Sequence, residues 1–441
     1  MAVLHDTFED TTKITKCDVK HSSEHEYIIA FKNTFDRKLF PNDFDIRAVE
    51  EQYTWINENI TQFFPNVPQS LLNMIPAFYR QINCELSPVE KPTWMDMDKY
   101  HRGQRFVRDH YASIVVIKIV GIIHLCTFND FLKPMIMSKR SETPYLGFKR
   151  YLSTIQRLLN WYDGEPWVKG TLAYKDMLHA RKIHLLIRKK LCGLDNKQID
   201  KASIIAKPWC PDRELFVKDF TAACPFENFG QRPYMLFSKT PYRPKDINNA
   251  DMAVAQCCLI SSLVLWPQNV GVHDATNEDL EALCHMWRCY GYFLGIEDEY
   301  NFCRGSLEEI KQRVRDMFQY WIIPNFKDIT PEWEHMTKCF IEPFNYYPFV
   351  YLPYKVVILM AVDSLNLNMP YIYTSLNYLE WIAYKSLTFI LRHALKHSSL
   401  RAIFNKIVYK IINKATNFSP EKHAELQEKS KKQLSSLSAM C

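Results

Sequence analysis

Apolar residues recur at the three- and four-residue spacing of an α-helix over most of this chain, and glycine is scarce. The helical pattern is strong from about Tyr100 onward, and only 11 of the 441 residues are glycine. Few glycines and long helical patterns favour packed helices over sandwiches or doubly wound sheets. The sequence therefore predicts an all-α fold, with a large helical core and added N- and C-terminal helices.

Proline and polar residues divide the predicted helices into three parts. Residues 1–88 are expected to form an N-terminal helical extension, residues 89–320 the central core, and residues 321–441 an aromatic-rich helical region with a basic tail. Within the core, residues 206–246 contain six prolines. We predict a long ordered crossover loop there, of a kind that often covers a pocket.

Charge and cysteine content exclude several classes of protein. The net charge of +6 is modest and basic residues are interleaved with acidic ones, so we expect no nucleic-acid partner. The 13 cysteines include no CxxC pair, and no secretory signal is visible, which favours reduced thiols in the cytoplasm or on the cytosolic face of an internal membrane. The apolar stretches 112–126 and 349–362 are too short or too interrupted to span a membrane and are predicted to be buried core helices.

One predicted helix, residues 172–191, carries a histidine in the middle of an apolar face. Helical spacing places five residues on that face: Met177, Ala180, His184, Ile187 and Leu191. Arg181 and Arg188 lie at its edge. An apolar stripe with one central imidazole suits a flat macrocycle such as haem, whose two propionates the guanidinium groups can pair with. A histidine that belongs to an ordinary packed core fits the same spacing, and the pattern alone does not separate the two interpretations.

The preceding predicted helix, residues 146–161, has a polar face beside its apolar one. Arg150, Thr154 and Arg157 share this face at spacings of four and three residues. Arg150 and Thr154 therefore fit a single ligand, through a charge-assisted bond and a hydroxyl bond. A solvated helix surface is the alternative interpretation.

Together these segments resemble the haem-dependent oxygenase family that includes bacterial latex-clearing protein and the fungal endoplasmic-reticulum oxygenase of mycophenolic acid synthesis. The family pattern is an Arg-x-x-x-Thr helix followed by a Val-Arg-x-x-His-x-x-x-Arg helix. Here the first is Arg150 to Thr154, and the second runs from Ala180, which replaces the valine, to Arg188. The segments that begin at Asp251 and His285 are similar to later parts of the family, so the resemblance covers about residues 90 to 310.

The resemblance implies a globin-like helical core that holds a non-covalent haem b. It makes His184 the iron ligand and Arg150 and Thr154 the pocket residues needed for haem binding or activity, beside the predicted haem contacts of Arg181 and Arg188. The absence of a CxxCH motif agrees with non-covalent attachment.

The implied activity is an oxygenation that uses O2 on a hydrophobic, isoprenoid or lipid-like substrate. Two departures from the family matter. Ser153 stands where rubber oxygenases carry a lysine that caps the distal side of the iron, and the catalytic carboxylate has no secure counterpart, Glu142 being the nearest candidate. A catalytically inactive haem- or lipid-binding protein of the same fold therefore stays open, as does a purely structural helical protein.

Two C-terminal features suit a hydrophobic substrate. The aromatic-rich residues 340–373 are expected to line a channel, or simply to pack in the core. From Tyr384 onward, apolar and basic residues fall on opposite sides of a helix, a pattern typical of peripheral contact with a membrane surface. A solvated terminal helix is the alternative.

Overall fold

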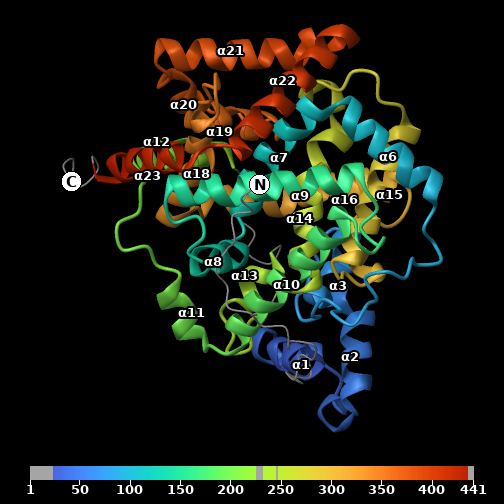
Figure 1. Ribbon diagram of the computed structural model, residues 1–441. Helices are drawn as coiled ribbons and strands as arrows, with labels where there is room; N and C mark the ends of the chain where they lie inside the picture. The colour runs from blue at the N-terminus through green and yellow to red at the C-terminus, as the bar shows by residue number, and fades with distance from the viewer. Residues whose placement is uncertain (1–22, 225–231, 245–246, 436–441) are drawn as a thin grey trace.

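The computed structural model describes residues 23–224, 232–244 and 247–435. Within these ranges the chain forms helices joined by turns, without a sheet, and its one isolated β-bridge joins Gln81 to Asn248 (Figure 1). The prediction of an all-α fold is confirmed. The globin-like arrangement of its core stays a prediction.

The helices fall into three successive groups along the chain. The first comprises α1 (Ser23–Thr34), α2 (Val49–Glu58), α3 (Ile60–Phe63), α4 (Gln69–Leu72) and α5 (Met74–Ala77). The second comprises α6 (Met97–Asp109), α7 (Tyr111–Cys126), α8 (Asn129–Met137), α9 (Pro144–Asp163), α10 (Leu172–Cys192), α11 (Asn196–Ala202), α12 (Arg213–Ala223), α13 (Pro233–Phe237), α14 (Asn249–Leu265), α15 (Asn277–Phe293) and α16 (Leu307–Met317). The third comprises α17 (Ile323–Lys327), α18 (Pro331–Ile341), α19 (Tyr354–Asp363), α20 (Pro370–Thr374), α21 (Tyr378–Arg392), α22 (Ser398–Thr416) and α23 (Pro420–Ser435).

One continuous apolar core draws side chains from all three groups, from Tyr27 on α1 to Leu426 on α23. The three-part division of the chain stays a prediction, and residues 1–22 of its first part lie outside the described residues. α9 crosses the middle of the molecule, between α19–α22 on one side and α10 and α13 on the other (Figure 1). This central helix is also the one that carries Arg150 and Thr154.

α7 is a buried core helix, as the sequence predicted for residues 112–126. It is apolar on nearly every side and has no acidic residue, which is typical of a helix enclosed by others. It packs against α14, and the Cys258 carbonyl oxygen of α14 lies so near Gly121 that it would be 2.1 Å from a Cβ there. In the part of the chain that the structure describes, no single helix has the length and composition of a membrane span. Taken together, α6 and α7 reach that length and composition, but they meet at a 92° bend.

The prediction of one buried helix over residues 349–362 is only partly right. α19 begins at Tyr354, and Val356 to Val362 lie in the core except for the half-buried Met360. Pro353 takes the N-cap position, so the residues before it are not helical. Phe349 is 99% exposed and has a φ of 62°, a left-handed conformation that is rare for an aromatic residue.

The prediction that residues 206–246 form an irregular loop is wrong for α12 and α13. Pro208 and Pro211 precede α12, and Pro233 opens α13, so these prolines bound the helices rather than interrupt them. Phe216 and Phe220 of α12 are fully buried against Trp333 of α18. Residues 225–231 and 245–246 of the predicted loop lie outside the described residues.

α18 fastens the start of this crossover through a buried carboxyl group. Glu334 is fully buried; its Oε1 accepts a hydrogen bond from the Asp212 amide at 2.9 Å, and its Oε2 has no hydrogen-bond partner. Lys338 donates to the Asp212 carboxylate at 2.8 Å. Desolvation by burial is the largest influence on Glu334 and raises its pKa to about 7.

This raised pKa predicts a loss of stability as the pH increases. Between the unfolded pKa of 4.5 and the folded value of about 7, the unfolded chain has released this proton while the folded chain keeps it, so the free energy of unfolding falls with pH. Glu334→Gln is expected to flatten that fall, measured as the urea midpoint from pH 5 to 7.5. Glu332→Gln, on the same helix, is the control. An unchanged slope in the Glu334 variant would contradict the assignment.

Candidate functional site

α9 and α10 form an antiparallel helical hairpin through the middle of the molecule. The Thr143 side chain caps α9 and Thr171 caps α10, and the predicted ranges 146–161 and 172–191 agree with the observed helices to within two residues. Asp176 of α10 accepts a hydrogen bond from Asn160 of α9 at 2.7 Å and lies 3.7 Å from the Arg157 guanidinium. These contacts join the closed end of the hairpin.

The middle of this hairpin is incompletely covered by the rest of the protein. Tyr151 and Trp161 of α9 and Met177 and Leu191 of α10 are buried near the ends. Between them, no residue of 153–160 or 178–187 is buried, although both stretches are rich in leucine or isoleucine. Partly exposed apolar side chains on two central helices leave a surface that an apolar ligand would bury.

His184 lies in the middle of this surface. Its Nδ1 atom is buried without a hydrogen-bond partner, and its Nε2 atom has no hydrogen bond to a described residue either. Burial lowers the pKa of the ring to about 4, so the imidazole is neutral at pH 7. The side chain as a whole is only half-buried. It is therefore a neutral nitrogen base without a hydrogen-bond partner among the described residues, which is the state required of a metal ligand.

The surroundings of His184 favour a macrocycle over a bare metal ion. Across the described ranges, no three His, Cys, Asp or Glu side chains lie close enough together to hold a metal. A structural or catalytic zinc site needs at least three protein ligands. A haem iron needs one, because the porphyrin supplies the other four nitrogen atoms. A single imidazole on a partly exposed apolar hairpin is compatible with haem, whose binding stays a prediction.

Arg181 and Arg188 flank His184 as predicted, and their guanidinium groups contact the backbone of the segment before α6. Arg181 donates to the carbonyl oxygens of Cys84 and Leu86 at 2.8 and 2.7 Å and to that of Phe293 at 3.2 Å. Arg188 is buried and donates to the Ile82 carbonyl at 3.4 Å. Both arginines thus tie residues 82–86 to α10, and their contact with haem propionates stays a prediction.

Arg150 has more donors to spare. Its Nη1 donates to the Ser141 hydroxyl at 3.1 Å, the one hydrogen bond that its guanidinium makes within the described residues, and its plane lies 5.6 Å from the Tyr151 ring centre. Thr154 is exposed and its hydroxyl donates back to the Arg150 carbonyl at 3.0 Å. Arg150 and Thr154 therefore lie one turn apart beside the uncovered surface, and their catalytic role stays a prediction.

Ser153 and Glu142 stand at the two positions where the chain departs from the rubber oxygenases. Within the described residues, neither has a contact that indicates a catalytic role. Ser153 is half-buried on α9. The Glu142 carboxylate is 3.9 Å from the exposed Lys139 amine, and its backbone oxygen contacts His335. The sequence candidate for a catalytic base thus lies in a surface ion pair.

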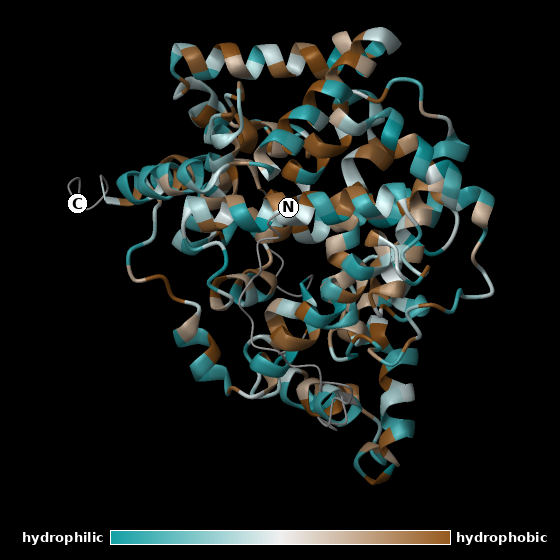
Figure 2. Cartoon of the chain, in the orientation of Figure 1, coloured by the Kyte–Doolittle hydropathy of each residue, from teal (hydrophilic) through white to brown (hydrophobic). Residues whose placement is uncertain are grey.

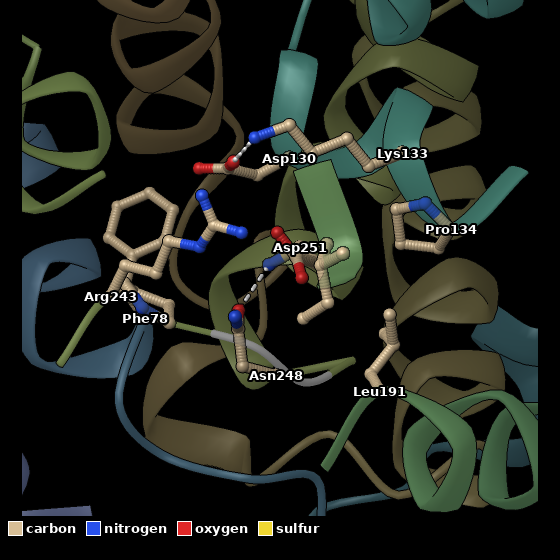
Figure 3. A pocket seen from close by; sticks show the side chains of 10 residues that line it. Phe78, Asp130, Lys133, Pro134, Leu191, Arg243, Asn248 and Asp251 are labelled. Carbon is tan, nitrogen blue, oxygen red and sulfur yellow. Dashed lines mark hydrogen bonds and ion pairs between the residues drawn. The ribbon is translucent and has the colours of Figure 1, made fainter. Parts of the chain in front are cut away.

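A different carboxyl group, Asp130 on α8, lines a small cavity where α8, α10, α11 and α14 meet (Figure 3). The cavity has a volume of about 30 Å³ and Leu191 of α10 forms part of its wall. Burial raises the pKa of Asp130. The Lys133 amine, 3.8 Å from the carboxylate, opposes this shift. A space of this size fits water. The sequence analysis did not identify Asp130, because an acidic residue in the first turn of a helix is ordinary.

The segment that begins at His285 is held together internally. Arg288 binds the Asp298 carboxylate through two hydrogen bonds of 2.8 and 2.6 Å, and the ring nitrogen Nε2 of His285 accepts from the Asp96 amide at 3.0 Å. Asp298 thus has a definite partner in Arg288. The helix α15 that carries this segment begins with a capping box, in which Thr276 and Asp279 make reciprocal bonds.

A second candidate site is a large apolar groove on the side of α9 away from α10. It has a volume of about 480 Å³ and is lined by α7, α19, α21, α22 and residues 344–352, almost entirely with aliphatic and aromatic side chains. Ile155 of α9 also contributes to its wall. The residues predicted to line a channel, 340–373, supply one wall, while α7, α21 and α22 supply the others.

Comparison with known proteins returned no match, whether against protein-family models, curated proteins or solved structures.

Proposed function

We propose that this chain is a b-type haem-dependent oxygenase that acts with O2 on a hydrophobic, lipid-like substrate. The observation that carries the proposal is the neutral imidazole of His184, without a hydrogen-bond partner, on the partly exposed apolar middle of the α9–α10 hairpin. The motif pair Arg150 to Thr154 and Ala180 to Arg188 supports it through its resemblance to the haem oxygenases of the latex-clearing type. Haem, when bound, would supply the redox chemistry with O2.

The residues of this chain would divide the remaining work. His184 would hold the iron from one side, because its ring is neutral and makes no competing hydrogen bond. The spare donors of Arg150 suit an anionic group, such as a haem propionate or a substrate carboxylate. The aliphatic residues of the hairpin would exclude water from the surroundings of His184, and Ser153 stands where the rubber oxygenases carry a lysine.

The purified protein is expected to show a Soret band, either as isolated or after addition of haemin. Reduction with dithionite and addition of carbon monoxide should shift this band, as expected of a protein-bound haem that can still bind a small ligand. Oxygen consumption with a reductant and an unsaturated lipid would then establish turnover. A protein that remains colourless with haemin would refute the proposal.

A second candidate is an inactive relative that binds haem or lipid without chemistry. The apolar groove, whose volume of about 480 Å³ falls in the range of small-molecule sites, favours lipid binding in its own right. The surface position of Glu142 and the serine at position 153 also favour it. Haem or lipid binding without any consumption of O2 would decide for this candidate.

A further inference from the structure

α21 lies at the outer edge of the molecule (Figure 1). Apolar residues lie on two of its sides. One side closes the groove described above, with Leu379, Ile382, Leu387 and Ile390. The other points away from the protein and combines large aromatic residues with cations at helical spacing: Tyr378, Trp381, Lys385, Phe389 and Arg392. Tyr378 is 75% exposed and Phe389 is 61% exposed.

α22 continues this pattern beside α21. Ile403 and Ile407 are exposed on its outer face, where Lys410 and Lys414 share the same helical stripe. Figure 2 shows hydrophobic and hydrophilic residues alternating along the outer turns of α21. Of the 23 large hydrophobic side chains that are exposed in the described residues, 13 lie between Phe349 and Tyr409. The apolar exposure of the molecule is therefore concentrated on this one region.

After Glu380, which pairs with Lys355 at 3.4 Å, the charge of α21 and α22 has a single sign. Residues 381–420 contain seven lysines and arginines and no aspartate or glutamate, although the chain as a whole is nearly balanced. Arg401 is paired with Asp274 at 2.8 Å, and the other six cations are exposed. Exposed aromatic residues among cations that have no acidic partner in the described residues match the interface of a bilayer that contains anionic lipid.

We propose that the face formed by α21 and α22 docks on an anionic lipid bilayer, and that the groove behind α21 receives one hydrocarbon chain from a lipid of that bilayer. Lys385, Arg392, Lys410 and Lys414 contact the headgroups. Trp381 and Phe389 insert at the boundary between headgroups and chains, where aromatic rings are favoured. This inference concerns the side of α9 that faces the groove, away from α10. It holds whether or not haem binds at His184.

The groove is placed to accept a chain from such a bilayer. Phe349 contributes to its wall and is 99% exposed, in a strained left-handed conformation that holds the ring outward. A bilayer would cover this ring. The lining of the groove includes Ile155, on the same helix as Arg150 and Thr154. A chain that enters under α21 is thereby directed toward the helix that carries the candidate haem site.

Vesicle flotation tests the docking surface. The full-length protein is expected to float with vesicles of phosphatidylcholine containing a quarter phosphatidylserine and to stay unbound with phosphatidylcholine alone. The double variant Lys385→Glu/Arg392→Glu should lower the partition coefficient by about tenfold or more, since each cation near an anionic surface contributes about 1 kcal/mol. The control Lys431→Glu/Lys432→Glu, on α23, keeps the binding of the unmodified chain. Equal binding to both vesicles, or equal losses in both variants, would overturn the proposal.

Dansylundecanoic acid tests the groove separately. Its fluorescence should rise on binding to the unmodified protein, and Ala383→Trp, which fills the groove from α21, should abolish the rise. Ala402→Trp, at an exposed position of α22, is the control for the added indole. No rise with the unmodified protein, or an equal loss in both variants, would refute a chain site in the groove.

Two readouts separate this proposal from its alternatives. Light scattering without lipid should report a monomer; a dimer that Lys385→Glu/Arg392→Glu dissociates would identify the face as a self-interface instead. The Soret band, measured on the same samples, reports the haem site independently. Vesicle and probe binding by a colourless protein would refute the proposed oxygenase while supporting the bilayer contact, and the reverse result would do the opposite.

Discussion

Replacement of His184 by alanine is expected to abolish the Soret band of the haem-loaded protein and to weaken haemin binding by about 100-fold or more. Loss of a residue that only supports a metal ligand costs about 10- to 100-fold in metal affinity, and loss of the ligand itself should cost at least as much. The structure offers no second imidazole on the hairpin face to substitute for it. Titration of the purified variant with haemin, followed in the Soret region, measures the effect.

His179→Ala is the matched control, because it removes an imidazole from the same helix five residues earlier, on a different side. It should leave the haemin affinity within a few-fold of the unmodified protein. Free imidazole added to His184→Ala should restore much of the Soret band by entering the vacated space. Equal losses in both alanine variants, or no recovery with imidazole, would show that His184 contributes packing rather than a bond to iron.

The low pKa of His184 adds a pH dependence to the same measurement. The folded pKa of about 4 lies below the usual value of 6.5, so the folded imidazole stays neutral down to that pH. As the pH falls from 6.5 toward 4, the unfolded chain binds a proton on this imidazole and the folded chain does not. The free energy of unfolding therefore decreases over this range. The Soret band of the bound protein should accordingly be constant from pH 8 to pH 5.5.

The helical hairpin was predictable from the sequence, and its partners were not. Helical spacing placed His184 beside Arg181 and Arg188 because neighbours along a helix depend only on local geometry. The carbonyl oxygens that those arginines bind come from residues 82–86, about a hundred residues earlier. A periodic pattern does not identify a partner at that separation. The guanidinium groups that were expected to bind a ligand therefore proved to donate to backbone oxygens.

The same limit explains why α12 and the groove were incompletely predicted. Six prolines made residues 206–246 look irregular, although burial of Phe216 and Phe220 against Trp333 stabilises a helix between them. Amphipathicity identified the basic side of α21 correctly. It did not show that the opposite side closes a groove with α7, because α7 lies more than two hundred residues away in the sequence.

Gly121→Ala is expected to destabilise the protein by about 3 kcal/mol, near the upper end of the cost of overfilling a packed core. The added Cβ would lie 2.1 Å from the Cys258 carbonyl oxygen and 2.8 Å from its carbonyl carbon, both of which belong to the backbone of α14. Backbone atoms inside a helix cannot rotate aside, so α7 and α14 must separate. Urea unfolding followed by circular dichroism measures the change in midpoint.

Gly193→Ala is the control that separates the effect of crowding at Gly121 from the general effect of replacing glycine by alanine. In a helix interior, alanine is favoured over glycine by about 1 kcal/mol, which acts against the expected loss at Gly121. Gly193 ends α10 with an ordinary φ of −78°, and a Cβ there would come no nearer than 3.4 Å to the Lys189 oxygen. Its replacement should change the stability by less than about 1 kcal/mol. Similar midpoints for the two variants would mean that α7 and α14 are less closely packed than described. The wall of the groove that α7 supplies through Val116 and Ile119 would then be less firmly held as well.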